Sequence, residues 1–330
     1  MRRSVALRWT LLGLLPVVLF SLVLLTGSAD ISLSTVLRSG GTESVAGRLI
    51  LYSRLPRGLT ALLAGAALAV AGLGMQTLLG NPLAGPFVLG IHAAATASVA
   101  VMSLLVPVWA ATSLGATVAA SIGAAAALIL LLILAARVGS ILKLTIFGVL
   151  LGYAFAAVVT LALQLASPRE LSAFVGWTFG SFGRTDFADL GILGVATLAG
   201  VSITFLLAKQ MDALYLGTEE ATLLGVSLRR LRLAIFFAAS LLVGGVTAFC
   251  GPLAFIGVAA PHLSRWLVHS SRHRTLLGAC LLVGASVALI GELVASMPGQ
   301  SGRLPLNAVL SLLGIPVIAG VLLGLGGQET

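Results

Sequence analysis

The sequence predicts an all-α polytopic membrane protein with about ten transmembrane helices. Of its 330 residues, 59% are hydrophobic and only 9% are charged, and the mean hydropathy is +1.13. A soluble globular chain of this length cannot bury so much apolar surface. Several apolar runs also reach the roughly 20 residues that a helix needs to cross a bilayer. We therefore treat residues 1–330 as a single transmembrane domain.

The charged residues and the cysteines exclude other classes. A net charge of +9 could favour nucleic acid, but the charges are few and hydrophobic runs occur throughout the chain. A basic membrane face explains the charge better, so we expect the lipid bilayer and no nucleic acid as a partner. Cys250 and Cys280 lie in different hydrophobic segments. We expect them to be small packing residues rather than a disulfide.

Ten apolar segments, separated by more polar links, are expected to cross the membrane. The first follows Arg2, Arg3 and Arg8, as a cleaved signal peptide also would, but it is longer than a usual signal core and further spans follow. The expected spans are 10–26, 57–79, 87–106, 112–136, the segment from the Arg137–Lys143 link to 165, 190–208, 233–250, 253–268, 276–296 and 304–324.

Two connecting segments need separate interpretation. Asp30–Ser53 has no sustained apolar run and is expected to be a polar loop. Ser167–Asp189 is too polar to cross the membrane, but it mixes aromatic residues with glycine. That composition is typical of the membrane–water boundary, and it predicts a short boundary helix at about 170–183.

The distribution of lysine and arginine predicts the orientation. With the N-terminus inside, the inner segments hold twelve basic and four acidic residues, and the outer segments hold seven and six. The inner face then carries a charge of +8 and the outer face +1. Because basic residues are retained on the cytoplasmic side, we expect both termini to be cytoplasmic.

The segment from Arg54 to Gly90 is the most informative part of the chain. Arg54 and Arg57 flank Pro56, and a long apolar run crowded with Gly and Ala follows. Small residues spaced three and four apart let neighbouring helices approach closely, so this helix is expected to be buried among others. The run ends in Gln76 and the turn Asn81-Pro82-Leu83-Ala84.

This segment resembles the FecCD-type permease subunits of bacterial ABC importers for iron–siderophores, haem and cobalamin. The residues that carry the resemblance are Arg54, Pro56, Arg57, the Ala-Gly-Ala-Ala-Leu-Ala run, Gln76, Asn81 to Ala84, Pro86 and Leu89-Gly90. Phe255-Ile256-Gly257, Pro261-His262, Arg265 and His273-Arg274 match a further family motif. The aspartate that relatives carry before that histidine is Arg272 here. His262 is expected to be a hydrogen-bonded structural residue rather than a ligand.

The stretch from Tyr215 to Gly225 predicts a very short helix at about 218–225. Thr218 could cap it, Glu219 and Glu220 suit the positive end of its dipole, and Gly225 could close it in the left-handed conformation. Alone, the stretch could be an ordinary solvated loop. The resemblance implies a cytoplasmic coupling helix that contacts an ATPase. The residues assigned to it are Leu216, Gly217, Thr218, Glu219, Glu220, Ala221, Leu224 and Gly225.

The resemblance also implies a type II ABC importer permease architecture and a set of partners. These are two cytoplasmic ATPase subunits, a substrate-binding protein and a second permease subunit, in the bacterial inner membrane. It implies docking of the binding protein at the outer arginines Arg54, Arg57 and Arg303. It also implies an inner gate at Asn81, Leu83, Ser140 and Ile141.

One departure from the family pattern bears on the second subunit. Relatives carry an acidic residue near the end of the ninth span, an arginine four residues later, and a glutamate before Leu-Pro. Here Glu292 keeps the acid, but Ser296 replaces the arginine and Arg303 the glutamate, while Asn307 replaces a glycine. A homologous partner could supply the missing arginine, so the sequence favours a heterodimer over a homodimer.

The sequence predicts no enzyme activity, catalytic residue, cofactor or metal site in this chain. It has no Gly-rich loop with Lys and Ser or Thr to hold ATP phosphates, and no cluster with metal-ligand spacing. Ferric siderophores are the favoured cargo, with haem and cobalamin as alternatives. An ion-coupled secondary transporter would keep ionisable residues mid-membrane, and a membrane-embedded hydrolase would show polar pairs at matching depth. Glu292 is the only acidic residue expected within a span.

Overall fold

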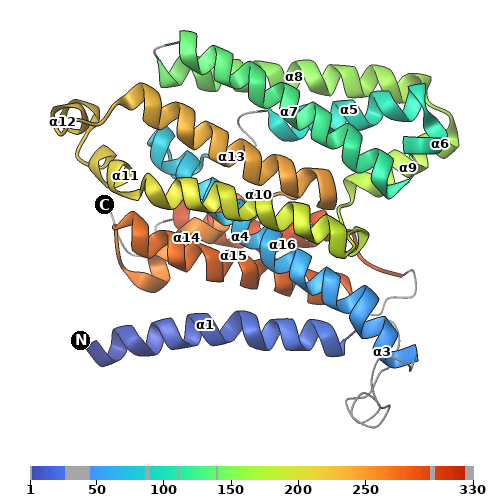
Figure 1. Ribbon diagram of the computed structural model, residues 1–330, viewed down its shortest axis with the longest axis horizontal. Coiled ribbons are helices and arrows are strands. Elements are labelled where there is room, and N and C mark those ends of the chain that lie inside the picture. The colour runs from blue at the N-terminus through green and yellow to red at the C-terminus, as the bar shows by residue number, and fades with distance from the viewer. Residues whose placement is uncertain are drawn as a thin grey trace.

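The computed structural model describes residues 2–26, 45–85, 90–110, 112–138, 140–297 and 302–323. These residues are almost entirely helical, and the long helices run roughly along one common direction (Figure 1). The short helix α12 (Thr218–Leu223) lies at one end of this bundle, and α9 (Pro168–Thr178) lies at the other. We call these the α12 end and the α9 end. Residues 86–89, 298–301 and the C-terminal segment 324–330 lie outside the described ranges.

Seven helices in the described ranges are long and apolar enough to cross a membrane. They comprise α1 (Arg2–Leu25), α4 (Leu55–Leu79) with the turns before it, α7 (Ser113–Arg137), α8 (Ile141–Leu165), α10 (Phe187–Leu206), α13 (Leu228–Cys250) and α15 (His273–Ala295). Two shorter apolar helices, α5 (Ile91–Leu105) and α16 (Leu306–Leu322), lie at further expected positions. The remaining expected span contains only α14 (Ile256–Val268). At 13 residues, α14 rises about 20 Å, which is too short to cross. The expected number of about ten helices is therefore roughly consistent with the fold.

Helix α4 is the centre of the bundle, and it packs against α15, α14, α13 and α10. Its glycines permit these contacts. A Cβ on Gly65 would lie 2.2 Å from the carbonyl oxygen of Gly284 in α15, and a Cβ on Gly72 would overlap the backbone of Gly257 in α14. The backbones touch directly at both crossings, as the small-residue pattern predicted.

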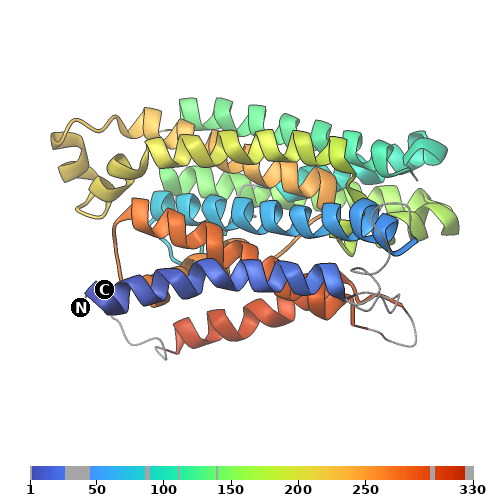
Figure 2. The same ribbon diagram turned by 60° about the horizontal axis from the view of Figure 1, so that its bottom comes forward.

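The remaining helices extend this centre in two directions. On one side α13 packs against α10 and α7, and α7 in turn contacts α5, which contacts α8. On the other side α1 lies along α15, as Figure 2 shows for the blue helix beside the orange and red C-terminal helices. Most of α8 is exposed, since only Leu144, Gly148 and Ala162 are buried. In a membrane this exposed helix faces either lipid or another subunit.

The expectation of a polar loop over Asp30–Ser53 is wrong for its second half. A helix begins at Val45 as α3 (Val45–Leu49) and continues through the π-helical turn η1 (Ile50–Arg54) into α4. Pro56 has no N–H and its ring would clash with the carbonyl of Tyr52 in a regular helix. The wider turn, in which Leu55 donates to Ile50 O, accommodates the proline without ending the helix. Residues 27–44 lie outside the described ranges.

The first helix is an integral part of the bundle. The Trp9 ring lies over Gly278 in α15. At the other end of α1, Arg54 Nη1 donates to the carbonyl oxygens of Leu24 and Leu25, at 3.0 and 2.9 Å. Carbonyls in the last turn of a helix have no partner within that helix, and a cation there also complements the dipole. Arg54 therefore caps α1 from the neighbouring helix.

A short helix lies near the position expected for the boundary helix, as α9 and the single turn η3 (Phe182–Arg184). Its place at the membrane boundary stays a prediction. Ser167 and Glu170 form a capping box at the start of α9. Arg184 donates to the carbonyls of Gly176 and Trp177 at its end, and burial lowers the pKa of this guanidinium from its ordinary value. Cys250 and Cys280 are both free and buried in separate helices, as expected for packing residues.

Candidate functional site

The α12 segment is a separate hairpin-like projection at one end of the bundle (Figure 1). Helix α11 (Ala208–Leu214) leads through a tight turn into α12. Gly225 closes α12 at a φ of +84°, as expected, with Val226 N donating to Ala221 O. The expected cap by Thr218 is wrong. Gly217, at a φ of +117°, occupies the N-cap position without a side-chain cap, and Thr218 is already helical.

The surface of α12 is suited to contact with another protein. Only Ala221 of this helix is buried, and α12 contacts α11 and α13. Leu223 is 88% exposed, and Leu216 and Leu224 are also largely exposed beside the Glu219 and Glu220 carboxylates. Large exposed apolar side chains on and beside one short helix favour a partner that covers them. The two glutamates make that surface acidic as well as apolar.

The turn after α4 is tied to α14 at the same end. Gln76 Oε1 accepts a hydrogen bond from Arg265 at 2.8 Å, and His262 Nε2 donates to Pro82 O at 2.7 Å. His262 therefore has the structural role that the sequence suggested. Within the turn, Asn81 Oδ1 accepts from Leu83 N at 2.9 Å, and Leu83 is exposed.

The other half of the expected gate begins α8. Ser140 is the N-cap of this helix, where its hydroxyl accepts from Lys143 N, and Ile141 is the first helical residue. Both expected halves lie at the α12 end (Figure 1). In the ranges described above, no hydrogen bond joins them. The gate assignment stays a prediction.

An ion cluster lies at the α9 end, where α4 and α15 meet. Glu292, only 2% exposed, binds Arg303 Nη2 through Oε1 at 2.5 Å and pairs with Arg57 Nε at 3.6 Å. Arg303 thus provides within this chain the cation that Ser296 cannot. Ser296 instead donates to Leu293 O, and Asn307 accepts from Ala254 N.

The three arginines expected to dock a partner differ in accessibility. The Arg54 side chain is buried against the end of α1. The Arg57 and Arg303 side chains are 21% and 38% exposed. A docking partner at this end would therefore meet Arg303 first, and Arg54 would act mainly through the position of α1.

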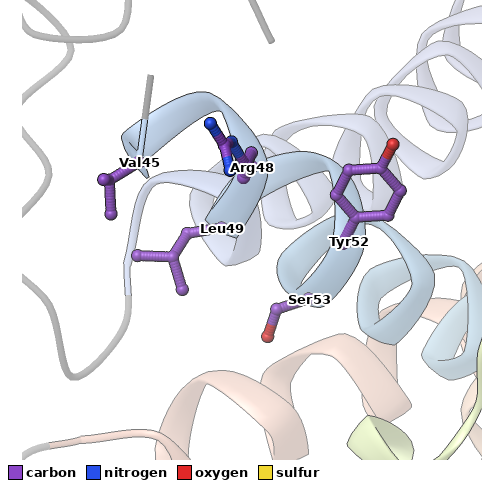
Figure 3. Close-up of a pocket in the computed structure, with 5 residues that line it drawn as sticks. All are labelled: Val45, Arg48, Leu49, Tyr52 and Ser53. Carbon is purple, nitrogen blue, oxygen red and sulfur yellow. The ribbon is translucent and has the colours of Figure 1, made fainter. Parts of the chain in front are cut away.

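Two cavities lie among the described residues. A shallow hollow of about 340 Å³ lies at the α9 end. Figure 3 labels the residues that line it, Val45, Arg48, Leu49, Tyr52 and Ser53. A smaller apolar cavity of about 170 Å³ lies between α14, α15 and α16. Neither lining contains a carboxylate or an imidazole. In the part of the chain that the structure describes, no three His, Cys, Asp or Glu residues are grouped to hold a metal ion.

Sequence reasoning missed a further set of polar contacts between α11, α15 and α4. Asp212 and His273 bond each other, and His273 also reaches Thr77. The family motif pointed to His273, but no local pattern connects these three positions, which are far apart in the sequence.

Comparisons with known proteins agree with this architecture. Residues 14–324 match the FecCD transport family. The chain is 36% identical to the vitamin B12 import system permease protein BtuC of Klebsiella pneumoniae, over 86% of each chain. It is 35% identical to the Fe(3+) dicitrate transport system permease protein FecC of Escherichia coli K12, over 84% of this chain and 83% of the relative. Ferric enterobactin permease FepD of the same strain is 33% identical over 92% and 91%.

A solved structure extends the likeness to the fold. It is an inward-facing metal-chelate type ABC transporter, with a TM-score of 0.84 and 29% identity. The match covers 94% of this chain and 97% of the other. The helical bundle is exposed along α8, and it ends in a short projection that is both apolar and acidic. Together with this architecture, the matches show that the chain belongs to the FecCD transport family, as a membrane-spanning permease subunit of an ABC importer.

Proposed function

We propose that this permease imports ferric siderophores by alternating access, with a binding protein delivering the cargo. The observation that supports this cargo class is that several similar proteins are named for iron or metal chelates. FepD and FecC serve ferric enterobactin and Fe(3+) dicitrate, and the structural neighbour is of the metal-chelate type. The BtuC relatives, named for vitamin B12, keep cobalamin as the second candidate, with haem as a third.

An uptake panel tests the cargo. The permease, its ATPase and its binding protein would be reconstituted together and offered ferric siderophores, ferric citrate, haem and cobalamin at equal concentrations. We expect uptake of a ferric chelate at least tenfold above the other classes. Uptake of cobalamin or haem alone would replace the proposed cargo without changing the permease assignment.

We propose that the α12 end faces the cytoplasm and contacts two ATPase subunits, in the bacterial inner membrane. The basic residues counted above favour this orientation, and both helix α1 at its start and α16 at its end reach the α12 end (Figure 2). The exposed leucines and glutamates of α12 supply the contact surface. ATP hydrolysis belongs to the partner subunits. The gate at Asn81, Leu83, Ser140 and Ile141 then closes the path on the cytoplasmic side.

A second permease subunit is expected to cover the exposed face of α8. The sequence favoured a distinct homologous partner because Ser296 leaves an arginine missing. The Arg303–Glu292 pair supplies that cation within one chain, so this particular argument for a heterodimer loses its force. Co-purification decides the question, because a tagged chain expressed with its genomic neighbours brings down a second permease only in a heterodimer.

The same preparation tests the gate. With Leu83→Cys in both subunits of a homodimer, or at the matching position of a partner, the thiols should cross-link in the closed state and block transport. If the cysteine reacts with a cytoplasmic thiol reagent equally in every nucleotide state, the gate lies elsewhere.

A further inference from the structure

The contacts between α11, α15 and α4 form a compact polar joint near the α12 end. Asp212 Oδ1 accepts two hydrogen bonds from His273, one from the backbone N and one from Nδ1, each at 2.7 Å. His273 Nε2 lies 2.8 Å from Thr77 Oγ1 of α4. The His273 side chain is fully buried, and the Tyr215 ring stacks on it with centroids 5.0 Å apart.

This joint replaces a cap that α15 lacks within its own loop. Arg272 occupies the N-cap position of α15 and makes no side-chain cap. The free amide of His273 is satisfied instead by Asp212, which belongs to another helix. A carboxylate at a helix N-terminus is favoured by the dipole, and its hydrogen bonds are charge-assisted. The start of α15 is therefore held by the helix that leads directly into α12.

Beyond the joint, α4 and α15 pack so closely that we expect them to move as one unit. Their backbones touch where Gly65 meets Gly284, and a Cβ on either glycine would lie within 2.3 Å of the other's carbonyl oxygen. At the far end they are fastened again, because Arg57 of α4 pairs with Glu292 of α15. Closely packed elements pass on a displacement rather than absorb it. The joint and the ion cluster thus sit at opposite ends of one stiff pair of helices.

We propose that Asp212, His273 and Thr77 carry the displacement of α12 into the α4–α15 pair, and through it to the ion cluster at the α9 end. The inference rests on the proposed contact between α12 and an ATPase. The other route out of α12 passes through Gly225, which has a positive φ and no side chain, into α13. On that side Arg232 of α13 donates to Val138 O at 3.1 Å, in the link before α8. The hydrogen bonds of Asp212 and His273 lead instead to α15 and α4. Asp212, His273 and Thr77 are positioning residues, since no cargo or nucleotide touches them in this account.

The test measures whether ATP still moves the α9 end when the hydrogen bonds of Asp212 or Thr77 are removed. Spin labels at Val45→Cys and Val108→Cys report the distance between the helical extension of α4 and α6 (Pro107–Ala110). These side chains are 76% and 86% exposed, whereas both native cysteines are buried. The labelled permease is purified in complex with its ATPase and measured with and without ATP under trapping conditions. The readout needs no cargo, so a wrong cargo assignment leaves it intact.

Asp212→Ala should at least halve the ATP-dependent shift in label distance, while the ATPase still co-purifies and still binds ATP. Thr77→Val keeps nearly the same volume and removes only the contact of His273 with α4. It should also reduce the shift in label distance, and it provides a second test if Asp212→Ala folds poorly. The matched control is Asp186→Ala, which removes a capping aspartate that bonds only within the first turn of α10. A full shift in both Asp212→Ala and Thr77→Val would overturn the proposal.

Discussion

Reversing both charges of α12, with Glu219→Arg and Glu220→Arg, should abolish uptake while the permease still inserts into the membrane. Both glutamates are exposed in the first turn of a six-residue helix, beside exposed leucines. Arginine there opposes the helix dipole, at a cost of about 0.3–1 kcal/mol per residue. It also places a like charge against any partner surface that complements acidic residues, which costs several kcal/mol. We expect loss of ATPase binding in a pull-down and more than tenfold less uptake.

Two further variants separate a lost contact from a melted helix. Glu219→Gln with Glu220→Gln removes the charges but keeps the helix favourable, so it should leave partial uptake. Leu223→Asp alters a side chain that is 88% exposed and should also weaken ATPase binding, although the fold of the bundle is untouched. Unchanged uptake in the double arginine variant would remove the coupling role of α12.

Neutralising the accessible arginine of the ion cluster, with Arg303→Gln, should slow association with the binding protein about tenfold at low salt. Charges at the rim of an interface act mainly on the association rate, and salt screens them. Glutamine can still donate to Glu292, and the Arg57 pair remains, so the permease should keep its melting temperature within a few degrees. Stopped-flow binding in detergent at two salt concentrations measures the effect.

The matched control for this change is Arg169→Gln, an exposed arginine of α9 at the same end. It alters the total charge equally but lies outside the cluster. If both variants slow association alike, the binding protein senses only the net charge of this face. If neither does, Arg303 has a structural role with Glu292 and does not dock a partner.

The sequence was most informative where a physical requirement leaves a local pattern. Small residues in Arg54–Gly90 predicted a buried helix, and Gly65 and Gly72 do touch neighbouring backbones. Gly225 was expected at a positive φ because a short helix needs closing, and it has one. The expected spans 112–136 and 276–296 lie within three residues of α7 and α15 for the same reason, since length and hydropathy are local properties.

The failures occur where a distant residue decides the local structure. Polar residues such as Arg48 and Ser53 suggested a loop, yet the helix continues through them. It is held there because Arg54 donates to a carbonyl oxygen at the end of α1. The expected cap by Thr218 is instead a local error, because the adjacent Gly217 takes that position. The substitution at Arg272 left the start of α15 without an evident cap. Only the folded chain shows that Asp212, some sixty residues earlier, provides it.

The most direct test of the central claim asks what powers transport through this chain. Proteoliposomes would contain the permease with its ATPase and binding protein, with ATP on the α12 side, and the ferric chelate would be supplied on the α9 side. We predict uptake that requires ATP and the ATPase and that persists when proton and sodium gradients are collapsed. Uptake by the permease alone, driven by either gradient without ATP, would contradict the account and establish a secondary transporter.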